Sequence, residues 1–314
     1  MCNSAVILAA GRGSRLGKIT ERRSKAMCPV AGVPMVERVL ESFRVAGVTR
    51  FIIVAAPHDE ELINFYHDRG EVTVVFQENP KGSAKALEVC AAHLEGRFFV
   101  TACDSLVPPT AIEQLREEVQ SRGAAGGIGI MEVDATQSLQ ARSVVALDGC
   151  NIERIIEKPA VHERISNITS IPLYLLSENI FELLIELKPS VRGEYELPEA
   201  LNAMVENGQV LIGARVSERL ELTNANDLLS LNEVYLSRRK DDVDIHSKTE
   251  IDPSVILNAP VVIEEGCSIA KGCIVGPFVY VERNSRIASG CRLERSLILR
   301  DSTVNKDLIG DVIA

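Results

Sequence analysis

Short apolar runs alternate with stretches of helical periodicity over roughly the first three quarters of the chain. Each run has the length and composition of a strand buried on both faces, as in a parallel sheet. Strands that alternate with helices are typical of a mostly parallel sheet with helices on both faces, so we expect a Rossmann-like α/β domain over residues 1–236. The predicted strands are residues 5–10, 51–55, 72–76 and 98–101, and the predicted helices include residues 34–46 and 84–94.

A different period begins after the charged residues 238–242. Apolar residues recur at every sixth position, and small or apolar residues often occupy the fourth position after them. Such a repeat builds a parallel β-helix, in which each coil buries its inward residues on the neighbouring coils. We therefore expect a linker over residues 237–249 and a short β-helix over 250–314. The sixth-position residues are Ile251, Leu257, Ile263, Ile269, Val275, Val281, Ile287, Leu293 and Leu299, and the fourth-position residues include Val255, Cys267, Cys273, Val279, Ser285 and Cys291.

The composition predicts a globular protein with no nucleic-acid or membrane partner. The chain has 314 residues and a formal net charge of −10, without a basic stripe to offset it, so a nucleic-acid surface is not expected. No segment approaches about eighteen apolar residues, and the first apolar run is too short for a signal peptide, which predicts a cytoplasmic location. The eight cysteines form no C-x-x-C pair, and we expect them to be reduced core residues.

The first apolar run leads directly into a turn with the features of a phosphate-binding site. It reads Gly11-Arg12-Gly13-Ser14-Arg15, and Lys25 follows within reach. Glycines let the backbone approach a phosphate closely, while free backbone amides and arginine side chains favour its negative charge. Lysine adds a compact positive charge suited to a phosphate oxygen. The turn therefore predicts a polyphosphate ligand.

Two well-known phosphate loops do not fit this turn. The dinucleotide motif G-x-G-x-x-G requires a third glycine where the chain has Leu16. The P-loop requires four residues between its glycines, but Gly13 and Gly17 enclose three, and Ile19 rather than a hydroxyl residue follows Lys18.

The turn and its surroundings instead resemble the opening of the sugar-1-phosphate nucleotidyltransferases. Their motif L-A-A-G-x-G-[ST]-R-L matches residues 8–16, and a lysine and a Pro-Val pair follow at Lys25 and residues 29–30. The resemblance implies that a sugar 1-phosphate attacks an NTP and releases pyrophosphate, by positioning and by charge neutralisation from protein cations and Mg²⁺. The cations it implies are Arg15, Lys25 and Lys158, and the nucleotide contacts of the turn are Leu8, Ala10, Gly11, Gly13 and Ser14.

The same resemblance implies two carboxylate ligands for Mg²⁺, an ion that prefers one or two protein carboxylates together with phosphates and waters. Asp104 follows the strand at residues 98–103, as in the family, although Cys103 replaces the usual glycine before it. The alternative for an aspartate in this place is a turn or a helix cap. The second ligand is expected at Glu221, with Asn224 as its rival.

Base recognition in the relatives uses a glutamine after a strand and then a glycine with a small residue. Gln77 and Gly82-Ser83 match this pattern. A glutamine amide offers a donor and an acceptor to a pyrimidine edge, which favours UTP or dTTP. On the sugar side, Glu157-Lys158-Pro159 resembles the family's E-K-P, and residues 194–197 match another segment. The sugar contacts this implies are Glu157, Lys158, Tyr174 and Glu194.

Two segments near the expected sugar site depart from the family. Residues 142–145, Arg-Ser-Val-Val, replace the strand-edge Y-G-V-V, and residues 170–174, Ser-Ile-Pro-Leu-Tyr, replace N-x-G-x-Y. Both changes put a side chain or a rigid ring where the backbone normally approaches the sugar. The nucleotide half of the site therefore matches the family, whereas the identity of the sugar stays open.

The repeat region resembles the left-handed hexapeptide β-helix that often follows such domains. Three hexads per turn then stack Cys273 on Cys291 as packing, and the helix is expected to join chains into a dimer or trimer. A bifunctional acyltransferase is disfavoured, because such domains usually present a histidine and none follows His246. Two alternatives remain for the activity, a non-catalytic regulatory relative and a cytidylyltransferase that acts on a polyol phosphate.

Overall fold

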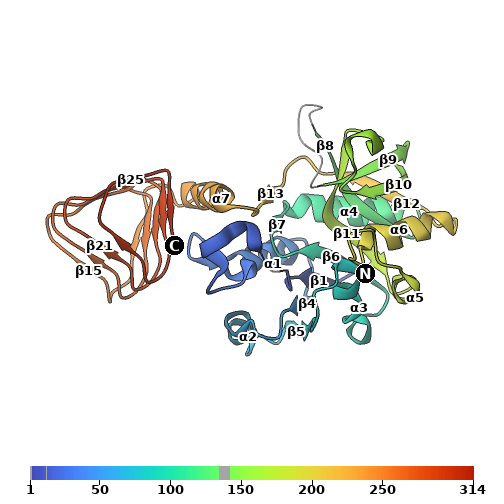
Figure 1. The fold of residues 1–314 in the computed structure, drawn as a ribbon, viewed down its shortest axis with the longest axis horizontal. Coiled ribbons are helices and arrows are strands. Elements are labelled where there is room, and N and C mark those ends of the chain that lie inside the picture. Colours follow the sequence, from blue (N-terminus) through green and yellow to red (C-terminus); the bar gives the residue numbers. More distant parts are fainter. Residues whose placement is uncertain (1, 12, 134–141) are drawn as a thin grey trace. The chain divides into compact units, whose positions relative to one another are not determined.

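Two compact units make up the chain in a computed structural model that describes residues 2–11, 13–133 and 142–314. The first unit consists of Met1–Gly11 and Val39–Leu220, and the second of Arg12–Arg38 and Glu221–Ala314. This division differs from the linear order of a catalytic domain, linker and β-helix expected from the sequence. The residues after the glycine-rich turn belong to the same unit as the β-helix (Figure 1).

A nine-stranded sheet forms the core of the first unit, in the order β5-β4-β1-β6-β11-β8-β12-β10-β9. Strands β5, β4, β1 and β6 run parallel, which confirms the runs predicted from the sequence. Strand β11 runs antiparallel to both β6 and β8, so the other half of the sheet is mixed. The strands are β1 Ser4–Leu8, β4 Arg50–Ala55, β5 Val72–Phe76, β6 Arg97–Ala102, β8 Gly126–Glu132, β9 Ser143–Asp148, β10 Asn151–Glu157, β11 Ile168–Ser177 and β12 Leu211–Arg215.

Helices cover both faces of this sheet, as two neighbouring phenylalanines of β6 show. Phe99 meets Phe43 of helix α1 edge to face at 5.7 Å, and Phe98 stacks on Phe181 of helix α5 at 5.7 Å. Successive side chains of a strand point to opposite faces, so α1 and α5 lie on opposite sides. The helices are α1 Met35–Val45, α2 Glu60–Tyr66, α3 Ser83–Glu88, α4 Pro109–Ser121, α5 Ile180–Glu186 and α6 Leu197–Glu206, with short helices η3 Ala91–His93 and η4 Val161–Glu163.

A parallel β-helix forms most of the second unit (Figure 1). Its coils repeat every eighteen residues at first, since Val243 pairs with Val261 and Val261 pairs with Val279. The first strand therefore lies inside the expected linker. Later coils are shorter, because Val281 pairs with Ile298. Three sheets, β14-β17-β20-β23-β26, β15-β18-β21-β24 and β16-β19-β22-β25, build the coils.

The inward positions of the β-helix follow the repeat of six up to Leu293, whereas the next predicted position, Leu299, is buried but lies outside this core. Ile298 joins the buried core in its place, because the last coils omit residues of the repeat. Cys273 and Cys291 are both buried in this core, and each directly precedes one of the paired strands β19 and β22, as the stacking prediction requires. The strands are β14 Val243–Ile245, β15 Glu250–Ile251, β16 Ile256–Leu257, β17 Val261–Ile263, β18 Ser268–Ile269, β19 Ile274–Val275, β20 Val279–Val281, β21 Arg286–Ile287, β22 Arg292–Glu294, β23 Ser296–Ile298, β24 Thr303–Val304, β25 Leu308–Ile309 and β26 Val312–Ile313.

Helix α7 (Ala225–Ser237) holds the N-terminal segment of the second unit through one buried amide. The side chain of Asn232 accepts a hydrogen bond from the Ala31 amide at 2.7 Å and donates one to the Pro29 carbonyl at 3.0 Å. This segment contains short helices η1 Ser14–Thr20 and η2 Lys25–Met27 and strands β2 Pro29–Val30 and β3 Val33–Pro34.

No helix in the described ranges is both long and apolar enough to span a bilayer. The left-handed sense of the β-helix stays a prediction.

Candidate active site

The loops that follow the parallel strands meet at one edge of the sheet in the first unit. Beyond the strand ends, the Cys103 amide donates to the Leu8 carbonyl at 3.1 Å, and the Gln77 amide donates to the Ala55 carbonyl at 3.0 Å. Ligands of such sheets bind outside the carboxyl ends of the strands. The predicted site residues that this edge carries are Leu8, Ala10, Gly11, Gln77 and Asp104.

Asp104 lies in the turn between β6 and β7 (Ser105–Leu106) and is half-buried. It caps no helix, because α4 begins at Pro109 and its N-cap residue is Pro108. In the described part of the chain, no cluster of three or more histidines, cysteines or carboxylates has the geometry of a metal site. A single carboxylate at this edge suits an ion that takes its remaining ligands from phosphates and water.

Gln77 and Gly82 lie in a loop that pairs with the sugar-side segment. The side-chain amide of the buried Gln77 donates to the Gly82 carbonyl at 3.3 Å. The Tyr195 amide donates to the Lys81 carbonyl at 2.7 Å, and the Ala84 amide donates to the Tyr195 carbonyl at 2.9 Å. Gly82 has a φ of +111°, and a Cβ there would lie 2.4 Å from the Tyr195 oxygen. Only glycine fits this close approach.

The hydroxyl of Ser83 has a structural partner in the same place. Its oxygen accepts a hydrogen bond from the Leu197 amide at 3.0 Å, at the first turn of α6. Helix N-termini leave such amides without a partner inside the helix, so Ser83 stabilises the start of α6. The contact of Ser83 with the nucleotide stays a prediction.

The predicted sugar-side residues gather around Glu157 at the end of β10. The Ser143 hydroxyl donates to the Glu157 carboxylate, and the Lys158 ammonium lies 3.6 Å from its other oxygen. Burial raises the pKa of the Tyr174 phenol, and the Glu157 charge raises it further. Lys158 itself has a φ of +48°, a conformation that costs free energy in residues with a side chain and clusters at functional sites. Ser143, a departure from the family, therefore orients Glu157.

Arg192 contacts two of the segments predicted for the sugar side and was not predicted from the sequence. Its guanidinium donates to the Glu196 carboxylate and to the Glu157 carbonyl, the latter at 3.4 Å. The hydrogen bond to Glu196 raises the pKa of Arg192, and the charges of Glu157 and Glu194 contribute. The sequence feature that could have identified Arg192 is its position two residues before Glu194. Arg192 thus joins the backbone at the end of β10 to the Glu196 carboxylate of the second predicted segment.

Arg219 is a second residue of this region that was not predicted from the sequence. Its Nε donates to the Ser105 hydroxyl at 2.9 Å, one residue after Asp104. Its charge also acts on Tyr174, whose pKa it lowers against the effect of burial. Arg219 therefore supplies positive charge between the metal candidate and the sugar side.

In the second unit, Gly13 of the glycine turn lies against the side chain of Lys25. Gly13 has a φ of +61°, and a Cβ there would lie 3.2 Å from the Lys25 Cβ. The Thr20 hydroxyl donates to the Gly13 carbonyl at 3.2 Å and closes η1. Ser14 and Arg15 are exposed at the start of this helix. Arg12, the other arginine of the turn, lies outside the described residues.

Asn224, the rival for the second metal ligand, is the N-cap of α7. Its side-chain oxygen accepts hydrogen bonds from the Asn226 amide at 2.9 Å and the Asp227 amide at 3.2 Å. Asp227 completes a capping box by accepting from the Asn224 amide at 3.0 Å. Because the cap already uses this oxygen, Glu221 of strand β13 (Leu220–Glu221) remains the candidate for the second carboxylate.

Known proteins match nearly the whole chain. The nucleotidyl transferase profile matches residues 4–235, and the GMPPB C-terminal domain matches residues 257–313. The bifunctional protein GlmU of Methanococcus maripaludis is 30% identical over 84% of this chain, and the chain spans 61% of its length. The low-salt glycan biosynthesis nucleotidyltransferase Agl11 of Haloferax volcanii is 29% identical over 96% of this chain and 88% of its own. A crystal structure of apo UDP-glucose pyrophosphorylase shares the fold, with a TM-score of 0.68 and 22% identity over 76% of this chain and 100% of its own. The protein belongs to the nucleotidyl transferase family.

Proposed function

We propose that this protein transfers a nucleotidyl group from UTP or dTTP to a sugar 1-phosphate, forming an NDP-sugar and pyrophosphate. The observation that carries the proposal is the shared edge of the parallel strands, where Gln77 and Asp104 follow β5 and β6 beside the residues after β1. The pairing of Gly82 with Tyr195 joins this edge to the sugar side. Membership of the nucleotidyl transferase family supports the reaction class.

In the proposed reaction, an oxygen of the sugar phosphate forms a bond to the α-phosphorus of the NTP. The bond from the α-phosphorus to the bridging oxygen breaks, and pyrophosphate leaves with the electron pair. The attacking oxygen is already ionised, so no general base is required. Arg15, Lys25 and Lys158 are proposed to neutralise the phosphate charges. Mg²⁺, proposed on Asp104 and Glu221, would supply further neutralisation of the triphosphate.

The hydrogen bond of Gln77 supports a preference for uracil or thymine. Its Nε2 donates to the Gly82 carbonyl, so its Oε1 is the atom that can accept a hydrogen bond from a base. Uracil and thymine carry a donor at N3, whereas cytosine carries an acceptor there. The orientation therefore favours UTP or dTTP over the CTP of the polyol phosphate alternative.

We expect Gln77→Ala to lower kcat/KM for UTP or dTTP about tenfold. The change removes one hydrogen bond in a buried place, worth about 1–1.5 kcal/mol. Steady-state kinetics with each nucleotide measures the effect. Gln120→Ala, at an exposed position of α4, is the control and should leave the kinetics unchanged. A loss of the same size for purine nucleotides would contradict the assignment of Gln77 to base recognition.

Pyrophosphate release across four nucleotides and a panel of sugar and polyol phosphates tests the proposed function. The expected result is turnover with UTP or dTTP and a sugar 1-phosphate, dependent on Mg²⁺. Equal or faster turnover with ATP or GTP would reject the pyrimidine preference. Turnover with CTP and a polyol phosphate alone would establish the cytidylyltransferase, and no release with any pair would favour a regulatory relative.

We also propose that the β-helix joins copies of the chain into a dimer or trimer in the cytoplasm. Strand β14 lies at the end of its sheet. Its residues Val243 and Ile245 expose more than a third of their surface. An open strand edge with apolar side chains is suited to pairing with another chain. This edge supports the proposed assembly.

A further inference from the structure

We infer that the β-helix holds the phosphate-binding segment in its working conformation, and that Glu282 is the positioning residue. The segment in question, called the loop segment below, comprises residues 13–34 and carries Arg15 and Lys25. The inference rests on the proposed function, in which these two cations bind phosphates. It gives the β-helix a part in the reaction besides assembly.

A buried ion pair links the loop segment to the β-helix. The Arg23 guanidinium lies 2.8 Å from the Glu282 carboxylate, and these side chains are only 3% and 5% exposed. Glu282 directly follows β20 and also accepts a hydrogen bond from the Arg300 amide at 2.9 Å. A buried carboxylate is tolerated when its partners satisfy it, and removing one partner leaves an uncompensated charge. The pair therefore fixes Arg23 at one place on the coil.

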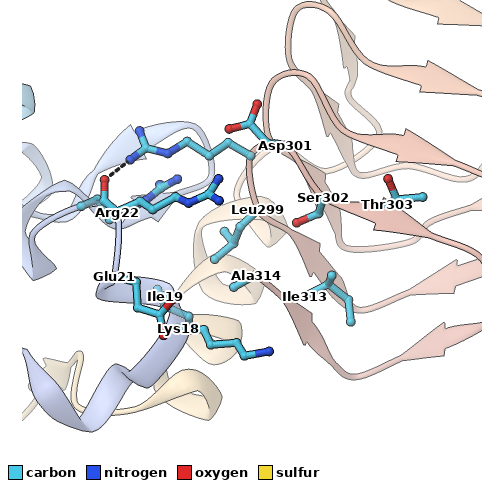
Figure 2. Close-up of a pocket in the computed structure, with 12 residues that line it drawn as sticks. Lys18, Ile19, Glu21, Arg22, Leu299, Asp301, Ser302, Thr303, Ile313 and Ala314 are labelled. Carbon is cyan, nitrogen blue, oxygen red and sulfur yellow. Dashed lines mark hydrogen bonds between the residues drawn. The ribbon is translucent and has the colours of Figure 1, made fainter.

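A second link lies one residue away. The Arg300 guanidinium donates to the Arg22 carbonyl, drawn as a dashed line in Figure 2. Beside this bond, a cavity of about 400 Å³ lies between Lys18 and Ile19 of η1 and residues of the last coil. Figure 2 shows Leu299 and Ile313 on its far side. The loop segment also approaches the β-helix at Gly32, where an added Cβ would lie 3.8 Å from atoms of Glu264 and Tyr280, but the polar links of Arg22 and Arg23 lie closest in sequence to Lys25.

This attachment is transmitted to the cations through the compact shape of the loop segment. Arg23 is two residues from Lys25, and the Met27 amide donates to the Ser24 carbonyl at 3.1 Å to close η2. Gly13 lies against the Lys25 side chain and is tied to Thr20 at the end of η1. A displacement of Arg23 therefore moves Lys25 and Gly13 together. Errors of about 1 Å in such positions cost on the order of 100-fold in rate.

The test compares Glu282→Gln with two control variants of the same chain. Glutamine keeps the shape of Glu282 and removes the charge that holds Arg23. Glu233→Gln makes the same change in an ion pair of the same unit, 2.9 Å from Arg295, that does not touch the loop segment. Ser285→Ala removes a buried hydrogen bond from Ser285 to the Leu299 carbonyl in the same β-helix.

We expect Glu282→Gln to lower kcat/KM for the nucleotide by about 10- to 100-fold, within the loss that misplacement produces. The KM for the sugar phosphate should change less than about twofold, because the residues proposed for the sugar lie outside the loop segment. All assays are run below the onset of unfolding of each variant. Arg23→Gln combined with Glu282→Gln should lose no more than either single variant, because the double variant buries no unpaired charge.

Limited trypsin digestion gives a readout that does not depend on activity. Glu282→Gln should be cut faster after basic residues 15–25, and Glu233→Gln should be cut like the wild type. Unchanged kcat/KM in Glu282→Gln, or an equal loss in Ser285→Ala, would overturn the inference. If the wild type shows no turnover, the proposed function fails, and digestion alone then decides whether Glu282 holds the segment.

Discussion

Replacing Asp104 by asparagine is expected to lower turnover about 10²–10³-fold at saturating Mg²⁺, the loss typical for one electrostatic element of an active site. Asparagine keeps the shape and the hydrogen-bonding capacity of the side chain but removes the charge that would hold the ion. Asparagine is also a favoured residue in turns and caps, so the melting temperature should barely change. Turnover and thermal unfolding, measured on the same preparations, separate a metal role from a turn role.

Asp148→Asn is the matched control for this prediction. Asp148 ends strand β9, is exposed, and should tolerate the change with normal turnover. The metal role of Asp104 would be abandoned if Asp104→Asn kept more than about a tenth of the activity, far from the expected loss. A lower melting temperature with near-normal turnover would instead establish the turn role.

Gly82→Ala is expected to affect both stability and nucleotide use. The new Cβ would lie 2.4 Å from the Tyr195 oxygen and 2.8 Å from its nitrogen. Neither atom can move freely, because each takes part in a hydrogen bond to the loop that contains Gly82. Strain of about 1–3 kcal/mol and the loss of hydrogen bonds of about 1 kcal/mol each should lower the melting temperature by about 10 °C. Displacement of Gln77 should lower kcat/KM for the nucleotide at least about tenfold.

The control is Gly123→Ala, another glycine with positive φ. Its φ is +61°, and no atom lies within 4 Å of an added Cβ. It should therefore show only the backbone strain, about 1 kcal/mol, with unchanged kinetics. If Gly82→Ala behaved like Gly123→Ala in both measurements, the close pairing with Tyr195 would not matter for the site.

The half of the sheet that carries the nucleotide-side residues could be predicted from sequence, whereas the mixed half could not. Strands β1, β4, β5 and β6 are nearly continuous apolar runs, which is the pattern of strands buried on both faces. Strand β8 gives a weaker signal because it contains Gly126, Gly127 and Gly129. A Cβ at Gly127 would lie 2.6 Å from Val119 of α4. Strand β8 carries glycine at this position because helix α4 packs closely against it. A contact of this kind cannot be predicted from the periodicity of the strand alone.

The sequence predicts site residues only where a short local motif carries the chemistry, and these residues stay predictions. The glycine turn, Lys25 and the acid after β6 follow short spaced patterns. Arg192 and Arg219 were missed because their roles depend on contacts with residues remote in sequence, Glu157 and Ser105. The N-cap role of Asn224 could have been predicted from the sequence, because an acid three residues later, here Asp227, is typical of a capping box.

The separation of Arg23 from Glu282 in the chain has a consequence for biosynthesis. The two residues are 259 positions apart. Ribosomes add about 5–20 residues per second, so Glu282 is synthesised tens of seconds after Arg23. The first unit has all but its opening strand within Val39–Leu220 and can complete its sheet during that time. If Glu282 holds the loop segment as inferred, a nascent chain reaches the final conformation of this segment only after the coil that contains Glu282 has been made.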